Sequence, residues 1–238
     1  EIKMFDRKKY KEFSQIQLKK RWGVPILMTV FTLVISMLFQ VPSLSKGLQI
    51  DYSGMSILDA LTMYSAATTT GTATLLTWIQ SFILLVIDMA VISVYIKMSH
   101  SPDPVTFGNF IEGFSTWLKA ILIGLWQGLF IVLWTFLLII PGLIKAYAYS
   151  QMVFIACEYP NVSVPKLMKI SKEITKGHKW DLFVLDLSFI GWFFVSFITC
   201  GLAGLYVTPY YQMTKVNAYH ALMKEAIDKG ILSPEDVK

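Results

Sequence analysis

Long apolar runs alternate with shorter polar segments along this chain of 238 residues. Because the hydrocarbon core of a bilayer takes about 20 helical residues per crossing, such runs predict membrane-spanning helices. Two of the six runs, the fourth and the sixth, are shorter than that. The predicted segments are 24–41, 73–96, 118–140, 143–157, 181–199 and 202–216. The pattern therefore predicts an all-α membrane protein with six transmembrane segments in a single helical domain, residues 1–238.

The segments between these runs have a helical period of their own. In 106–118 and 164–176 the apolar residues recur on one helix face, and 4–21 follows the same pattern less cleanly. We expect these to be interfacial amphipathic helices whose apolar faces contact lipid. Tryptophan, an interfacial anchor, stands at the start of each following span: Trp22, Trp117 and Trp180.

This recurrence predicts three units, each an interfacial helix followed by a membrane hairpin. Their ranges are 4–98, 106–157 and 163–216. The alternative is that tryptophan simply collects wherever a span enters the membrane.

Charge sets the expected orientation. Residues 1–22 contain eight Lys or Arg and 158–181 contain five, whereas 42–72 contain only Lys46. By the positive-inside rule both termini are cytoplasmic. We expect the basic helices to contact anionic lipid headgroups, and we expect no nucleic-acid partner. The candidate headgroup contacts are Lys166, Lys169, Lys172, Lys176, His178 and Lys179.

Apart from charges at the edges of the apolar runs, three charged residues stand inside them: Asp88, Lys145 and Asp186. A charge in a bilayer is costly, so each should be paired, neutral or in a polar cavity. One hypothesis is a polar intramembrane site between the second, fourth and fifth spans, in which Lys145 pairs with Asp88. Each residue also has a structural alternative. Asp88 could only join helices by a hydrogen bond, Lys145 could extend to the outer interface, and Asp186 could hold a lysine such as Lys179 or cap a helix end.

Proline and glycine mark candidate helix breaks at Pro141, Gly142 and Pro209. Broken helices expose backbone groups to substrates in many transporters. A second small-residue pattern, Gly124-x-x-x-Gly128, allows close helix packing within the chain, or with a membrane protein partner or a second copy.

Motifs of catalysis are missing from the sequence. We find no nucleophile elbow, no Walker loop and no His/Cys metal spacing, so we expect no enzyme, no cofactor and no metal. The segment SAATTTGT at 65–72 resembles the pore loops of Trk-type potassium transporters. An ion-selectivity filter needs several such loops around one axis, so the alternative is that this segment is only a threonine-rich connection. A cation channel or transporter is the remote alternative for the function.

Two longer stretches resemble a known family. They are IPGLIKAYAYS at 140–150 and GHKWDLF at 177–183, the latter continued by LDLSFIGW at 185–192. With Pro209-Tyr210 and Trp22-Gly23, they resemble the bacterial integral-membrane family called domain of unknown function 975. The resemblance implies a multi-span protein of the bacterial cytoplasmic membrane, similar in organisation to the membrane domains that accompany glycerophosphodiester phosphodiesterases. It implies no activity and no catalytic residues.

The function that we predict is a non-enzymatic membrane module that binds or moves a lipid or small solute through the polar intramembrane site. The alternative is a scaffold or accessory subunit without a ligand, whose buried charges only hold helices together.

Overall fold

The computed structural model describes residues 5–48, 51, 53–68 and 71–233, without the side chains of 41–48, 67–68 and 71–73. Throughout the described part the regular structure is helical, with no strand, which confirms the all-α prediction. The helices are α1 (Arg7–Leu18), α2 (Gly23–Leu48), α3 (Ile57–Thr68), α4 (Gly71–His100), α5 (Phe107–Gly113), the 3-10 helix η1 (Phe114–Thr116), α6 (Trp117–Leu137), α7 (Ile139–Tyr149), α8 (Met152–Glu158), α9 (Val164–Ile174), α10 (Lys179–Leu187), α11 (Ile190–Ile198) and α12 (Gly204–Asp228).

Five helical stretches are long and apolar enough to cross a membrane: Gly23–Gln40, Thr74–His100, Phe107–Leu137, Ile139–Glu158 and Lys179–Ile198. They correspond to the first five predicted segments. The predicted sixth segment, 202–216, is not a separate helix, because it is the N-terminal part of α12. The threonine-rich 65–72 segment includes the end of α3 and the beginning of α4, and most of its side chains lie outside the described part.

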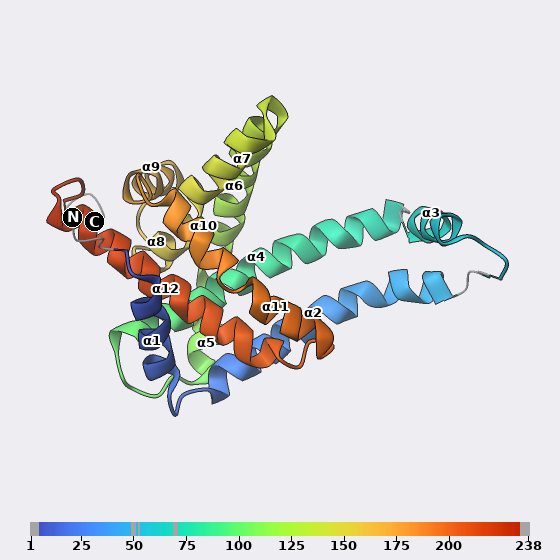
Figure 1. Cartoon of the computed structure of the whole chain (residues 1–238), viewed down its shortest axis with the longest axis horizontal. Coiled ribbons are helices and arrows are strands. Elements are labelled where there is room, and N and C mark those ends of the chain that lie inside the picture. The colour runs from blue at the N-terminus through green and yellow to red at the C-terminus, as the bar shows by residue number, and fades with distance from the viewer. Residues whose placement is uncertain (1–4, 49–50, 52, 69–70, 234–238) are drawn as a thin grey trace.

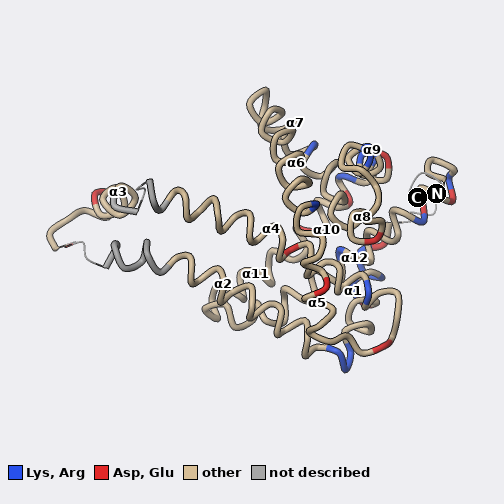
Figure 2. The backbone as a smooth tube through the Cα atoms, turned by 180° about the vertical axis from the view of Figure 1, so that it is seen from behind, with Lys and Arg blue, Asp and Glu red and all other residues tan. Residues whose placement is uncertain are grey.

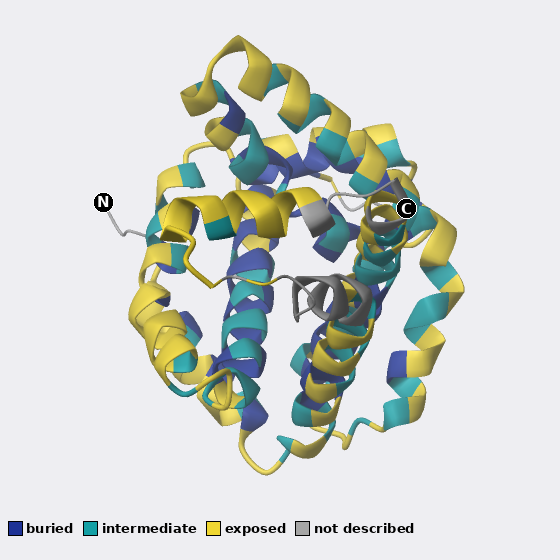
Figure 3. Ribbon diagram, turned by 90° about the vertical axis from the view of Figure 1, so that its right-hand side faces the viewer, coloured by how far each residue is buried: buried dark blue, intermediate teal, exposed yellow. Residues whose placement is uncertain are grey.

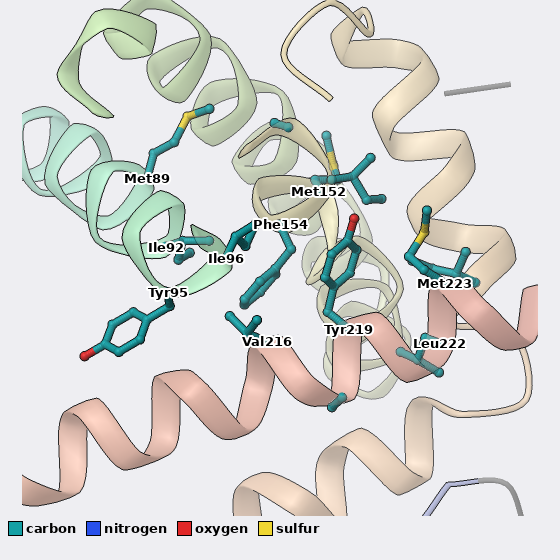
Figure 4. Close-up of a cluster of buried hydrophobic side chains, with 14 of the residues drawn as sticks. Met89, Ile92, Tyr95, Ile96, Met152, Phe154, Val216, Tyr219, Leu222 and Met223 are labelled. Carbon is teal, nitrogen blue, oxygen red and sulfur yellow. The ribbon is translucent and has the colours of Figure 1, made fainter. Parts of the chain in front are cut away.

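Three helices from distant parts of the chain make the centre of the fold. The C-terminal half of α4 packs against both α8 and α12 (Figure 1). In Figure 4, side chains from these three helices converge, and the ring of Phe154 stacks on Tyr219 with centroids 5.7 Å apart. The labelled residues of this centre are Met89, Ile92, Tyr95, Ile96, Met152, Phe154, Val216, Tyr219, Leu222 and Met223.

Each short amphipathic helix packs on one of these central helices. α5 packs on α4, α9 packs on α8, and α1 packs on α12. The apolar face of α9 is buried, as Leu167, Ile170 and Ile174 show. The prediction that these apolar faces lie in lipid is therefore wrong for α9, because its stripe contacts protein. In α1, Phe13 and Ile16 are exposed, and contact of this face with lipid stays a prediction.

The α6–α7 hairpin turns earlier than the proline and glycine suggested. Leu138, with an extended backbone, separates the two helices, and Pro141 sits within the first turn of α7, where its missing N–H costs nothing. A Cβ on Gly142 would come within 2.3 Å of the Thr135 hydroxyl, so this glycine allows α7 to lie close against α6. Pro209 also does not break its helix, because α12 runs through it.

The two ends of the molecule differ in surface. Lys and Arg gather around α1, α9 and the C-terminal half of α12, while α2, α4 and α6 carry few charges (Figure 2). Exposed residues cover the outer helix faces (Figure 3), and many of them are apolar. At the α6–α7 turn Phe136 is 87% exposed and Ile139 is 72% exposed. Water disfavours such a continuous apolar surface, whereas lipid accommodates it.

Candidate functional site

Asp88 lies on the wall of a cavity between α2, α4 and α12. The cavity has a volume of ≈ 440 Å³. The Asp88 side chain is exposed to it, and no described residue donates a hydrogen bond to the carboxylate. Its lining is Met28, Thr29, Thr32, Leu33, Ser81, Leu84, Leu85, Ile87, Asp88, Val91, Tyr95, Thr208 and Gln212.

The walls of this cavity combine apolar surface with a few hydroxyl groups. Thr29 and Thr32 donate to carbonyls of their own helix, those of Pro25 and Met28, at 2.9 Å. Their oxygens therefore keep lone pairs that can accept a hydrogen bond from a cavity occupant. A mostly apolar pocket with a few converging polar groups is typical of small-molecule sites.

Asp186 has the opposite environment. Its two carboxylate oxygens each accept a hydrogen bond from a tyrosine hydroxyl, Tyr147 at 3.0 Å and Tyr211 at 2.9 Å. These bonds join α10 to α7 and α12. The contacts of Asp186 in the described part of the chain are these two tyrosines, and no ion pair there joins it to Lys179, contrary to the interpretation that Asp186 holds Lys179.

Lys215, a cation near both acids, is not among the residues predicted from the sequence. Lys215 acts electrostatically on Asp88, and with Asp186 it lines a small cavity. The same cavity is lined by Gln151, a buried residue whose side-chain oxygen accepts no hydrogen bond within the described part of the chain. Lys215 stands near the end of the predicted segment 202–216, so a check of that segment for charged residues would have found it.

Lys145 is not the partner of Asp88. Its ammonium lies over the indole ring of Trp134, 4.4 Å from the centroid, and both residues belong to the α6–α7 hairpin. A cation–π contact of this kind stabilises by about 0.5–1 kcal/mol at an exposed position. The predicted grouping of Asp88, Lys145 and Asp186 is therefore wrong in its cation: α12 supplies Lys215 instead.

The predicted headgroup contacts occupy the outer side of α9 and the loop after it. Lys169, Lys172 and Lys176 are exposed, and Lys166 and Lys179 are partly buried. His178 differs from these, because its ring contacts Asp181 at 3.2 Å and Glu225 at 3.1 Å.

The predicted interfacial anchors, which are tryptophans, stand at or next to the first residues of helices α2, α6 and α10. Trp117 and Trp180 are exposed, whereas Trp22 stacks on Tyr206 at 4.8 Å.

An all-helical fold, five stretches that can span a bilayer and an exposed apolar surface define the class: a multi-pass helical membrane protein. Residues 136–226, which cover α7 to α12, match the model of a family described as "Protein of unknown function (DUF975)". This match supports membership in the family and agrees with the resemblance seen in the sequence. Searches of curated proteins and of solved structures returned no match. The matched segment contains Asp186 and Lys215 but not Asp88.

Proposed function

We propose that this protein is a non-enzymatic membrane module that binds or moves a lipid or small solute in the cavity beside Asp88. The observation that carries the proposal is a carboxylate without a hydrogen-bond donor from the described residues, on the wall of a ≈ 440 Å³ cavity. The site lies between α2, α4 and α12, not between the second, fourth and fifth spans as the sequence suggested.

The chemistry of the cavity favours an amphiphile with a donor-rich or cationic head. A carboxylate without a hydrogen-bond donor at membrane depth is unfavourable, and a ligand that donates hydrogen bonds to it relieves that cost. Leu33, Leu84 and Leu85 offer apolar surface for a chain. An ethanolamine or glycerol headgroup satisfies these requirements.

The same proposal includes six crossings with both termini in the cytoplasm of a bacterium, the N-terminal half of α12 being the sixth. The clustering of Lys and Arg around α1, α9 and the end of α12 supports this orientation (Figure 2). The exposed lysines of α9 then face the anionic headgroups of the inner leaflet.

Three repeated units account for the way the short helices pack. In this proposal each unit ends in a central helix, α4, α8 or α12, and receives an amphipathic helix from the next unit. α5 lies on α4 and α9 on α8, and α1 on α12 closes the cycle. The core shared by α4, α8 and α12 supports this reading.

A ligand-free scaffold or accessory subunit is the second candidate. The Asp186 network favours it, because there a charge joins three helices and leaves both oxygens occupied. The α6 surface supports it as well. A Cβ on Gly124 would collide with Leu85, whereas one on Gly128 would meet nothing within 4 Å, so this face has room for a partner helix or a second copy.

Lipid-dependent stabilisation separates the two candidates. The purified full-length chain in detergent is titrated with phosphatidylethanolamine or phosphatidylglycerol, and the midpoint of thermal unfolding is measured. At a lipid concentration 100-fold above Kd the stabilisation is about 2.7 kcal/mol. We expect Asp88→Asn to abolish the shift for at least one lipid.

Asp103→Asn is the matched control, because it makes the same change at an exposed carboxylate outside the cavity. It should keep the shift of the unmodified chain. If Asp88→Asn also keeps the full shift, or if neither lipid stabilises the unmodified chain, the binding proposal fails and the scaffold is favoured.

A further inference from the structure

Three metal-ligating side chains that are far apart in the sequence meet at one end of the central helices. His100 is the last residue of α4, Glu158 is the last residue of α8, and His220 lies on α12. One ligand atom from each lies within 4.8 Å of the others, and His100 Nε2 is 3.2 Å from a Glu158 carboxylate oxygen. The two histidine rings are 4.9 Å apart, edge to face. Each of the three central helices thus contributes one ligand.

We propose that His100, Glu158 and His220 form a site for a divalent transition metal such as Zn²⁺. Two imidazoles and one carboxylate are a donor set that zinc uses, with metal–ligand distances of about 2.0–2.2 Å. At these lengths tetrahedral ligand atoms stand about 3.4 Å apart. The His100–Glu158 pair, at 3.2 Å, is already close to that separation, and the remaining separations, of up to 4.8 Å, require side-chain rotation.

Neighbouring residues already hold two of the three ligands. The Tyr219 hydroxyl donates a hydrogen bond to one Glu158 oxygen, which leaves the other oxygen to face His100. Ser99 Oγ lies 2.8 Å from His220 Nε2. Hydrogen bonds of this kind orient ligands in known metal sites. Burial lowers the pKa of His220 below its ordinary value; Glu158 opposes this shift and His100 adds to it.

The site borders a second cavity, of ≈ 560 Å³, at the basic end of the molecule. His100 and His220 are both on its wall, together with Lys9 and Lys224. Three protein ligands leave one position of a tetrahedral zinc ion open, and the cavity beside His100 and His220 would give water or a small anion access to it. A bound ion would join the ends of α4, α8 and α12 and would still accept water or a small anion.

Metal content tests the proposal directly. The full-length chain is purified in detergent with a tag that contains no histidine, incubated with zinc, and dialysed. Elemental analysis should find one zinc per chain. His100→Ala and His220→Ala should each weaken zinc binding by at least about tenfold in a competition titration, since each removes a ligand, and Tyr219→Phe should weaken it by about tenfold through loss of ligand orientation.

The third histidine of the chain provides the control. His178 contacts Asp181 and Glu225 away from this site, so His178→Asn should keep the zinc affinity of the unmodified chain. Cobalt(II) is a second probe that does not depend on stability, because a four-coordinate site gives visible absorption bands that His220→Ala should remove. Absence of stoichiometric zinc in the unmodified chain, or unchanged affinity in both alanine variants, would overturn the proposal.

Discussion

Asp88 and Asp186 carry the same functional group on apolar helices, but the fold treats them in opposite ways. Asp186 accepts a hydrogen bond on each oxygen from Tyr147 and Tyr211 and so joins α7, α10 and α12. Asp88 faces a ≈ 440 Å³ cavity and accepts no hydrogen bond from any described residue. The first arrangement is what a structural acid requires, and the second is what a binding site offers.

A charge inside an apolar segment therefore does not by itself indicate function. Both residues satisfy the expectation that an intramembrane acid must have a reason to be there. Only the surroundings, contributed by other helices, distinguish an acid that holds the fold from one that remains available to a ligand. Substitutions at the two positions should therefore separate stability from binding.

The largest expected effect is at Asp186. Asp186→Leu leaves the hydroxyls of Tyr147 and Tyr211 without their acceptor and removes a negative charge near Lys215. We expect a loss of about 3 kcal/mol in the free energy of unfolding, measured by denaturant titration in detergent. Asp186→Asn, which keeps one acceptor oxygen, should lose less. If the leucine variant were as stable as the unmodified chain, Asp186 would not be the structural acid of the pair.

Lys215 should give an intermediate effect, because it stands near both acids. Lys215→Met is expected to cost about 1–2 kcal/mol of stability. A double-mutant cycle assigns that energy: Lys215→Met is combined with Asp88→Asn or with Asp186→Asn, and the departure from additivity is measured. Electrostatic interaction with Asp88 predicts a non-zero coupling in the first cycle. Additivity in both cycles would contradict the proposed role of Lys215 as the shared cation.

The sequence predicted the elements of this fold well, because hydropathy and helical period are local properties. The first five membrane segments and the three amphipathic helices all correspond to helices in the structure. It also identified the two acids.

Partners were predicted poorly, because they depend on which helices meet. Lys145 contacts Trp134, which is close in the sequence, whereas the cation near Asp88 comes from a residue 127 positions later, Lys215. The three residues of the proposed metal site are likewise separated by 58 and 62 positions. No spacing rule finds such a set, because α4, α8 and α12 bring it together only after folding.

The smallest expected effect on stability belongs to Asp88. Asp88→Asn keeps the size of the side chain and breaks no hydrogen bond from the described residues. It loses the attraction of Lys215 but also removes the larger cost of burying a charge, so the free energy of unfolding of the ligand-free chain should change by less than about 0.5 kcal/mol. The same substitution at Asp186 is the matched comparison and should cost more, because Tyr147 and Tyr211 lose a charged acceptor. Unfolding is measured for both variants after exhaustive detergent exchange that removes lipid. Equal losses at the two positions would mean that Asp88 also holds helices together, and the distinction between a structural acid and an available one would disappear.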